Sequence, residues 1–120
     1  GSGISNNSFL PQVIKSAKKN TIVLFGKGER KQDYIHIDDA VDLCLVCASV
    51  EKNDIYIGAT GESISNLEVC EEIKKHLNCN IEFTGVETGQ SFYFNINKVI
   101  QELNWKPKVK FSEGIKKMII

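Results

Sequence analysis

The sequence predicts an α/β fold, a small mixed domain of about five helices and short strands. Segments with apolar residues at helical spacing alternate along the chain with short runs of β-branched and aromatic residues. The 120 residues suffice for one domain and are too few for two ordinary ones. An apolar content of 42% and a charged content of 25% are values typical of a globular protein.

The first expected elements are a helix and a strand. Apolar residues at helical spacing predict a helix over residues 8–19, and Pro11 is tolerated there because it falls in the first turn. A β-branched run predicts a strand over residues 22–25. This strand is expected to end at the turn that Gly26 and Gly28 introduce.

A second strand, expected over residues 34–37, leads into a long helix. Asp38 is the expected N-cap and Val50 the expected end. Within this helix, residues 40–48 are apolar at every position except Asp42. Because a helix that is apolar on nearly every face must be surrounded, we expect a larger partner layer outside these 120 residues. A homodimer or a swapped dimer is the alternative cover.

Capping patterns organise the second half of the chain. Ser65 and Glu68 have the spacing of a capping box. Asn104 can adopt the left-handed conformation that ends a helix, and Pro107 blocks continuation. The remaining expected elements are a strand over residues 55–58, a helix opened by Ser65 that includes Leu77, a strand at residues 81–83, a helix capped by Asn97 that ends at residues 103–105, and a helix capped by Ser112 that runs through Met118.

Charge and hydropathy limit the class of protein. A formal net charge of zero argues against nucleic acid or an anionic membrane as the main partner. No apolar run approaches the roughly 20 residues that a membrane span needs, and no leader pattern is present. We therefore expect a soluble, cytoplasmic protein. Residues 1–3 have the composition of a cloning scar or of a native turn, which leaves residues 4–120 as the domain.

The cysteines allow three interpretations. A zinc site would need all four to converge, or three of them with His76. Structural zinc cysteines usually lie in turn-rich segments, whereas Cys44 and Cys47 lie within an apolar helical run. A disulfide is the second alternative. We expect all four cysteines, Cys70 and Cys79 included, to be inert thiols in the core, and we expect no metal site.

The most informative segment is residues 25–40, where a glycine turn, a β-branched run and two aspartates follow one another. The turn carries Arg30, the single arginine among 15 basic residues. Polar groups that cluster at an exposed turn suit an anionic small molecule, because guanidinium groups and exposed backbone amides both bind anions. The carboxylates of Asp38 and Asp39 are explained by helix capping and the helix dipole, so we assign no acid–base chemistry to them.

Four motifs occur in a fixed order: FLPQVI (residues 9–14), FGKG with DYIHIDD (25–28 and 33–39), IGATGESIS (57–65), and FNINK with ELNWKP (94–98 and 102–107). Together they resemble the C-terminal, substrate-binding part of an NAD-dependent epimerase/dehydratase, an extended short-chain dehydrogenase/reductase that acts on nucleotide sugars. Each motif alone is weak, but the ordered set covers nearly the whole chain. The resemblance implies that this is the C-terminal part of such an enzyme without its Rossmann domain.

The resemblance also shows what the chain lacks. The family's glycine-rich dinucleotide fingerprint is absent, and no tyrosine is followed four residues later by lysine. We therefore expect no catalytic residue and no bound cofactor in this chain. NAD or NADP is expected in the N-terminal Rossmann domain of the parent enzyme. The alternative is a stand-alone nucleotide-sugar-binding or protein-interaction module without catalysis.

The resemblance implies a substrate-binding set. Phe25 lies where the family stacks a ring on the nucleotide base, and Phe9 and Leu10 match a segment that lines the base and ribose site. Gln32 stands where the family carries an arginine for the sugar diphosphate. If Gln32 faces the pocket, Arg30, two residues earlier, projects to the same side of an extended segment and can replace it. The alternative is that Arg30 is a solvent-exposed residue of the turn.

Other positions depart from the family pattern or have a structural interpretation. Glu87 stands where the family has a second arginine, and Tyr56 where it usually has asparagine. Because the charge at Glu87 is reversed, the resemblance does not identify which sugar or which nucleotide the site binds. His36 matches a position that we interpret as structural.

Overall fold

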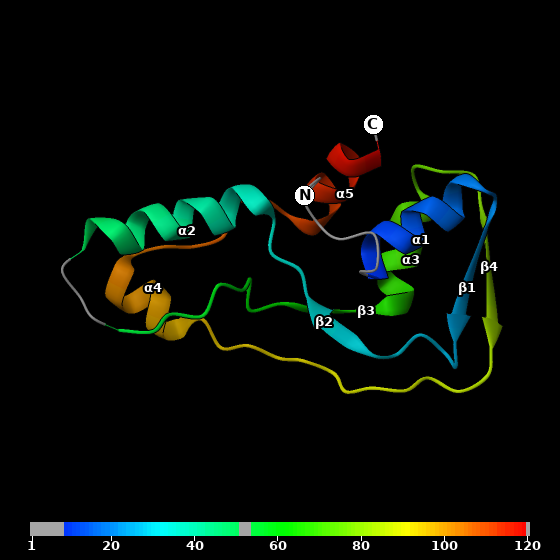
Figure 1. Ribbon diagram of the computed structural model, residues 1–120, viewed down its shortest axis with the longest axis horizontal. Helices are drawn as coiled ribbons and strands as arrows, with labels where there is room; N and C mark the ends of the chain where they lie inside the picture. Colours follow the sequence, from blue (N-terminus) through cyan, green and yellow to red (C-terminus); the bar gives the residue numbers. More distant parts are fainter. Residues whose placement is uncertain (1–8, 51–53, 120) are drawn as a thin grey trace.

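The computed structural model describes residues 9–50 and 54–119. Residues 1–3, expected to be a scar or a turn, lie outside this range. The elements are, in order, α1 (Phe9–Lys18), β1 (Thr21–Phe25), β2 (Lys31–Asp33), α2 (Ile37–Ser49), β3 (Ser63–Ser65), α3 (Asn66–Lys74), β4 (Asn80–Thr84), α4 (Asn97–Leu103) and α5 (Phe111–Ile119) (Figure 1). The predicted mixed α/β domain with five helices and short strands is confirmed within the described residues.

The molecule is elongated, with principal extents of 49 × 30 × 21 Å. One end holds α1, α3, α5, β1 and β4, while α2 and α4 lie at the other end (Figure 1). The strands β2 and β3 lie between the two ends, and a long extended segment between β4 and α4 runs along the molecule.

Two small ladders hold the strands. The strand β1 pairs with β4 in parallel, from Thr21 opposite Asn80 to Phe25 opposite Thr84. The strand β2 pairs with β3 in antiparallel fashion, with Gln32 opposite Ile64. A two-stranded ladder is marginal in water by itself, and α1 and α3 both pack against β1.

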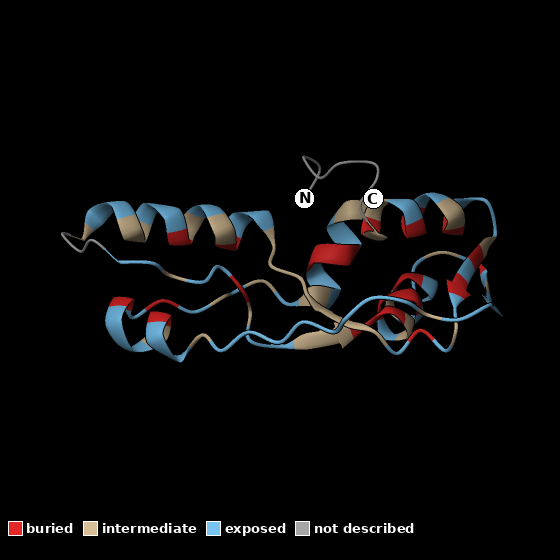
Figure 2. Ribbon diagram, turned by 60° about the horizontal axis from the view of Figure 1, so that its bottom comes forward, coloured by how far each residue is buried: buried red, intermediate tan, exposed pale blue. Residues whose placement is uncertain are grey.

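Buried apolar side chains of the described residues form a larger and a smaller core. The larger core lies among α1, β1, α3 and α5 (Figure 2) and contains Leu10, Val13, Ile14, Ala17, Ile22, Leu24, Val69, Cys70, Ile73, Cys79 and Ile115. The smaller core joins α2 to α4 and contains Leu43, Val99, Leu103 and Trp105. The indole Nε1 of Trp105 donates a hydrogen bond to Asp42 at 3.1 Å.

The apolar helix α2 is largely uncovered by the described residues. Within this helix, only Asp39 and Leu43 are buried, while Val41 is 51% and Leu45 is 66% exposed. The expectation that all cysteines are core residues is wrong for Cys44, which is exposed, and Cys47 is only half-buried. The physical reason is that no described layer packs on the outer face of this helix.

Cys70 and Cys79 are buried, as predicted. Burial, reinforced by the neighbouring Cys79, raises the pKa of the Cys70 thiol to about 12. A thiol with this pKa is unreactive near neutral pH. Within the described range no group of three or more histidine, cysteine, aspartate or glutamate side chains could hold a metal ion.

The capping predictions had mixed outcomes. The capping box is confirmed, because the Ser65 hydroxyl accepts the Glu68 N–H at 3.1 Å and the Glu68 carboxylate accepts the Ser65 N–H. Asn104 ends α4 with φ 53°, also as predicted. Asp38 is not the N-cap of α2, because His36 Nδ1 accepts the Asp38 N–H at 3.1 Å.

Other local predictions were displaced. The second strand is Lys31–Asp33 and not residues 34–37. Residues 55–58, all within the described range, form no strand, since no neighbouring segment pairs with them. Asn97 and Ser112 are not the caps that were expected. Ile96 precedes α4 as its N-cap and makes no side-chain cap, and Ser112 lies inside α5, which begins at Phe111. None of the described helices has the length and apolar character to cross a bilayer.

Candidate functional site

A cavity of about 300 Å³ lies between α1 and β1, beside the turn that follows β1. Three of the five predicted substrate-binding residues, Phe9, Phe25 and Arg30, line it. Asn66 from the start of α3 and Glu87 from the loop after β4 also line it, together with the polar residues Gln12, Ser16 and Thr88. The fold thus gathers aromatic rings and polar groups from four separate parts of the chain.

Phe25 marks the end of β1, and its side chain is 62% exposed. The chain turns directly after it, with Gly26 at φ 60° and its N–H bonded to the carbonyl of Thr84 at 2.9 Å. A Cβ at Gly26 would lie 2.8 Å from the backbone nitrogen of Glu87. Glycine is therefore required here for both the left-handed backbone and the close approach of the later loop.

The turn also caps helix α3. The N–H of Leu67 donates to the carbonyl of Gly28 at 2.8 Å, and the N–H of Asn66 donates to the carbonyl of Arg30 at 2.9 Å. Free amides at the start of a helix need such acceptors. The contact fixes Arg30 and Asn66 side by side, although they lie 36 positions apart in the sequence.

Glu87 joins the later loop to this turn. Its Oε1 accepts the backbone N–H of Glu29 at 2.8 Å and that of Arg30 at 2.9 Å, and its Oε2 accepts Asn66 Nδ2 at 3.2 Å. The charge reversal at this position is therefore used within the protein, because three N–H donors stabilise the carboxylate by hydrogen bonds. Further along the loop, Ser91 Oγ accepts the N–H of Lys31 at 3.0 Å.

The Arg30 side chain extends along the same loop. A Cβ at Gly89 would lie 2.6 Å from a terminal guanidinium nitrogen of Arg30, so glycine with φ 96° leaves room for the side chain. The Arg30 Nε is buried and has no hydrogen-bond partner among the described residues, and the same holds for Asn66 Oδ1.

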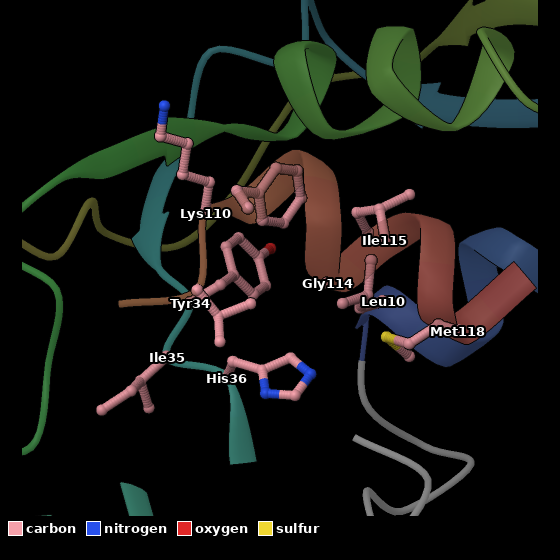
Figure 3. A pocket seen from close by; sticks show the side chains of 10 residues that line it. Leu10, Tyr34, Ile35, His36, Lys110, Gly114, Ile115 and Met118 are labelled. Carbon is pink, nitrogen blue, oxygen red and sulfur yellow. The ribbon is translucent and has the colours of Figure 1, made fainter. Parts of the chain in front are cut away.

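The two other predicted substrate-binding residues lie elsewhere. Leu10 is 7% exposed within the larger core and lines a different, mostly apolar cavity with Tyr34 and His36 (Figure 3). Gln32 lies in β2, opposite Ile64, and does not line the cavity beside β1. The predicted roles of Leu10 and Gln32 in binding stay predictions.

The aspartates and His36 serve the fold. Asp39 is 3% exposed and its carboxylate accepts the backbone N–H groups of Lys108 at 3.0 Å and Val109 at 2.9 Å. His36 caps α2, which agrees with its structural interpretation. Burial raises the pKa of Tyr34 to about 12, although the nearby Arg30 opposes this shift. His36 Nδ1 also lies 3.6 Å from Asp38 Oδ2, at the first turn of α2.

Sequence reasoning missed Asn66 as a site residue. Its position in the capping box supplied a sufficient local explanation, and the hydrogen bond to Glu87 joins residues 21 positions apart. The one signal in the sequence was Glu87, a carboxylate where the family pattern has an arginine. A carboxylate at that position needs hydrogen-bond donors, and Asn66 supplies one of them.

The elongated α/β fold thus places a cavity beside β1, with its wall supplied by α1, β1, the start of α3 and the loop after β4. A sequence profile described as GDP-mannose 4,6 dehydratase matches residues 6–118. The chain therefore belongs to the NAD-dependent epimerase/dehydratase family of extended short-chain dehydrogenases/reductases.

Characterised relatives span several reactions. The chain is 29% identical over 114 residues to CDP-paratose 2-epimerase of Salmonella typhi, covering 88% of this chain and 34% of that protein. It is 33% identical over 103 residues to dTDP-4-dehydro-6-deoxyglucose reductase of Escherichia coli, covering 82% of this chain and 33% of the relative. The chain thus spans about a third of the length of these relatives.

The fold likeness to solved structures is close. MoeE5 in complex with UDP-glucuronic acid and NAD superposes with a TM-score of 0.82 at 19% identity, covering 97% of this chain and 41% of that chain. At this level of identity the superposition shows a shared fold. The predicted C-terminal part of an extended short-chain dehydrogenase/reductase is confirmed at the level of the fold.

Proposed function

We propose that this chain is the substrate-binding portion of an NAD-dependent nucleotide-sugar epimerase or dehydratase and is catalytically incomplete alone. The observation that carries the proposal is the cavity beside β1, where Phe9, Phe25 and Arg30 meet. The relatives named above act on CDP- and dTDP-linked sugars according to their names, which supports a nucleotide-sugar ligand.

The residues of the cavity suit the parts of such a ligand. The exposed ring of Phe25 offers a stacking face for a nucleobase, and Phe9 adds apolar surface from α1. The guanidinium of Arg30 supplies positive charge for a diphosphate. Glu87 carries a negative charge beside this site, and three hydrogen bonds hold its carboxylate toward the turn and Asn66.

In this proposal the chain's own residues bind and orient. NAD, held by the rest of the parent enzyme, would supply the hydride acceptor for oxidation of a sugar hydroxyl. Holding the nucleotide at the cavity positions the attached sugar for that step. Binding energy from such a remote group can be used to orient the reacting part.

The uncovered face of α2 supports an additional domain. Val41 and Leu45 are exposed on this helix, and residues 55–58 carry a strand-like sequence without a pairing partner in the described range. We propose that an N-terminal Rossmann domain covers this region in the parent enzyme. The same exposure counts against a stand-alone module.

Calorimetry on the full-length protein and on the 120-residue chain tests the proposal. The full-length protein is expected to bind NAD or NADP and a nucleotide sugar. The chain alone is expected to bind neither dinucleotide. Tight dinucleotide binding by the 120 residues alone, or failure of the full-length protein to bind any nucleotide, would contradict the proposal.

A further inference from the structure

Glu87 links the loop after β4 to the turn after β1 and to the start of α3. Its Oε1 accepts the backbone N–H groups of Glu29 at 2.8 Å and Arg30 at 2.9 Å, and its Oε2 accepts Nδ2 of Asn66 at 3.2 Å. An ionised carboxylate accepts all three hydrogen bonds, whereas an arginine, which the family pattern has at this position, accepts none. The residue at this position therefore has a different task in this chain from the one that the pattern implies.

The hydrogen bonds of Glu87 also limit how an anion can be held beside the turn. Exposed backbone amides of a turn can bind an anion directly. Here the N–H groups of Glu29 and Arg30 already donate to Glu87 within the protein. Among the described residues that line the cavity, Arg30 alone carries a positive charge. A bound diphosphate therefore depends on the side chain of Arg30.

Other hydrogen bonds hold the loop to the turn on both sides of Glu87. The N–H of Gly26 donates to the carbonyl of Thr84 at 2.9 Å, and the N–H of Phe92 donates to the carbonyl of Lys31 at 2.9 Å. The carboxylate of Glu87 is thus one contact in a continuous seam. This arrangement argues against its displacement by the anion of a ligand.

The loop in turn sets the place of the Arg30 side chain. Gly89 follows Glu87 by two residues, and a Cβ at Gly89 would lie 2.6 Å from a terminal nitrogen of Arg30. The guanidinium therefore lies directly against the loop. A shift of the loop away from the turn would move the surface on which the guanidinium rests.

We propose that Glu87 is a positioning residue, which holds the Arg30 guanidinium in place for the diphosphate of a nucleotide sugar. Asn66 is the second anchor of the loop in this role. The inference deepens the proposed function and rests on it. If Glu87 acted by its charge alone, its removal would strengthen the binding of a diphosphate, because like charges repel. If it positions Arg30, its removal weakens binding.

Calorimetry on the full-length protein with Glu87→Ala distinguishes these opposite signs. The probes are the best-bound of UDP, CDP, GDP and ADP, and the same nucleoside without phosphates. We expect the variant to bind the diphosphate about 10-fold more weakly, because a misplaced binding group loses much of its effect. The nucleoside is expected to bind within about twofold of its affinity for the natural protein. A general loss of structure would instead weaken both ligands alike.

Three further variants assign the effect. Glu82→Ala removes the same charge at an exposed position of β4 outside the cavity, and is expected to bind both probes as the natural protein does. Glu87→Asp keeps the charge with a shorter reach, so it should also weaken the diphosphate, and it serves as a second test if Glu87→Ala does not fold. In an Arg30→Ala background, Glu87→Ala is expected to change diphosphate binding by less than about twofold.

The outcomes separate the inference from the proposed function. Equal or tighter diphosphate binding by both Glu87 variants would overturn the positioning role and leave the proposed function intact, as would equal weakening of diphosphate and nucleoside. A full effect of Glu87→Ala in the Arg30→Ala background would overturn the assignment to Arg30. If the natural protein binds none of the nucleotides, the proposed function is overturned, and the inference with it.

Discussion

The carboxylate of Glu87 accepts the backbone N–H of Arg30 at 2.9 Å, although the two residues lie 57 positions apart. The contact ties the loop after β4 to the turn after β1. It also explains how a negative charge is tolerated at this place in the fold, since hydrogen bonds from the protein itself stabilise the carboxylate.

Glu87→Gln is expected to loosen this contact. The amide retains one oxygen, and its NH₂ group would face the Nδ2 of Asn66, so the substitution loses an acceptor and introduces two opposed donors. We expect the full-length protein to lose about 1–3 kcal/mol of unfolding free energy. Hydrogen exchange should quicken at the amides of Glu29 and Arg30. Glu82→Gln, at an exposed position of β4, is the control. Equal exchange rates at the amides of Glu29 and Arg30 in the two variants would contradict the role of the Glu87 hydrogen bonds.

Asp39→Asn tests the buried acceptor at the start of α2. The carboxylate takes the N–H groups of Lys108 and Val109, one on each oxygen. An asparagine offers one oxygen only, so one of these amides loses its acceptor. Chemical denaturation should show a loss of about 1–3 kcal/mol. The matched change Asp38→Asn, at an exposed position of the same turn, should cost much less, and similar losses would contradict the assigned role.

Tyr34→Phe should change stability at alkaline pH. Burial raises the pKa of Tyr34 from 10.0 to about 12, so the fold favours the neutral phenol. This contribution is fully present below pH 10 and is lost as the pH rises toward 12. The variant should therefore lose less stability over this range than the natural protein. The pKa of the Cys70 thiol is raised from 9.0 to about 12, so ionisation of this thiol still lowers the stability of the variant at alkaline pH.

Denaturant unfolding at pH 8, 10 and 11 measures this effect. At pH 8 the variant should be as stable as the natural protein or more so, because the Tyr34 hydroxyl is buried without a partner among the described residues. Tyr93→Phe, at a residue that is 70% exposed, serves as the control. If Tyr34→Phe loses as much unfolding free energy between pH 8 and pH 11 as the natural protein, the raised pKa of Tyr34 is contradicted.

Leu45→Asp tests the covering of α2. Leu45 is 66% exposed, so the 120-residue chain should keep its thermal unfolding temperature. In the full-length protein the same change would place a charge at the proposed domain contact and lower the unfolding temperature. Gln101→Asp, at an exposed position of α4, should have little effect in either protein. Equal tolerance of Leu45→Asp in both proteins would count against the Rossmann domain as the cover of α2.

Local sequence rules predicted the features that depend on neighbours within a few positions. Ser65 and Glu68 are three residues apart and cap α3 as expected. Asn104 ends α4 in the left-handed conformation that its short polar side chain tolerates. The exposed apolar face of α2 also followed from composition, because Val41 and Leu45 belong to a helix with too few polar residues to be solvated.

Predictions that required a choice between adjacent candidates were less accurate. Both Asp38 and His36 can cap a helix, and the extended backbone of His36 decided which one does. The strand expected at residues 55–58 has the right residue types, but a strand also needs a partner, and none is provided within the described range. Propensity alone does not determine pairing.

The sequence by itself determined the order of elements, the family resemblance and the three cavity residues Phe9, Phe25 and Arg30. Only the tertiary structure decided how the cavity wall is closed. The hydrogen bonds of Glu87 to Arg30 and Asn66 join residues that are distant in the chain. Such contacts arise when separate elements pack, so no local pattern encodes them, and the same packing buries Arg30 Nε and Asn66 Oδ1 without a partner among the described residues.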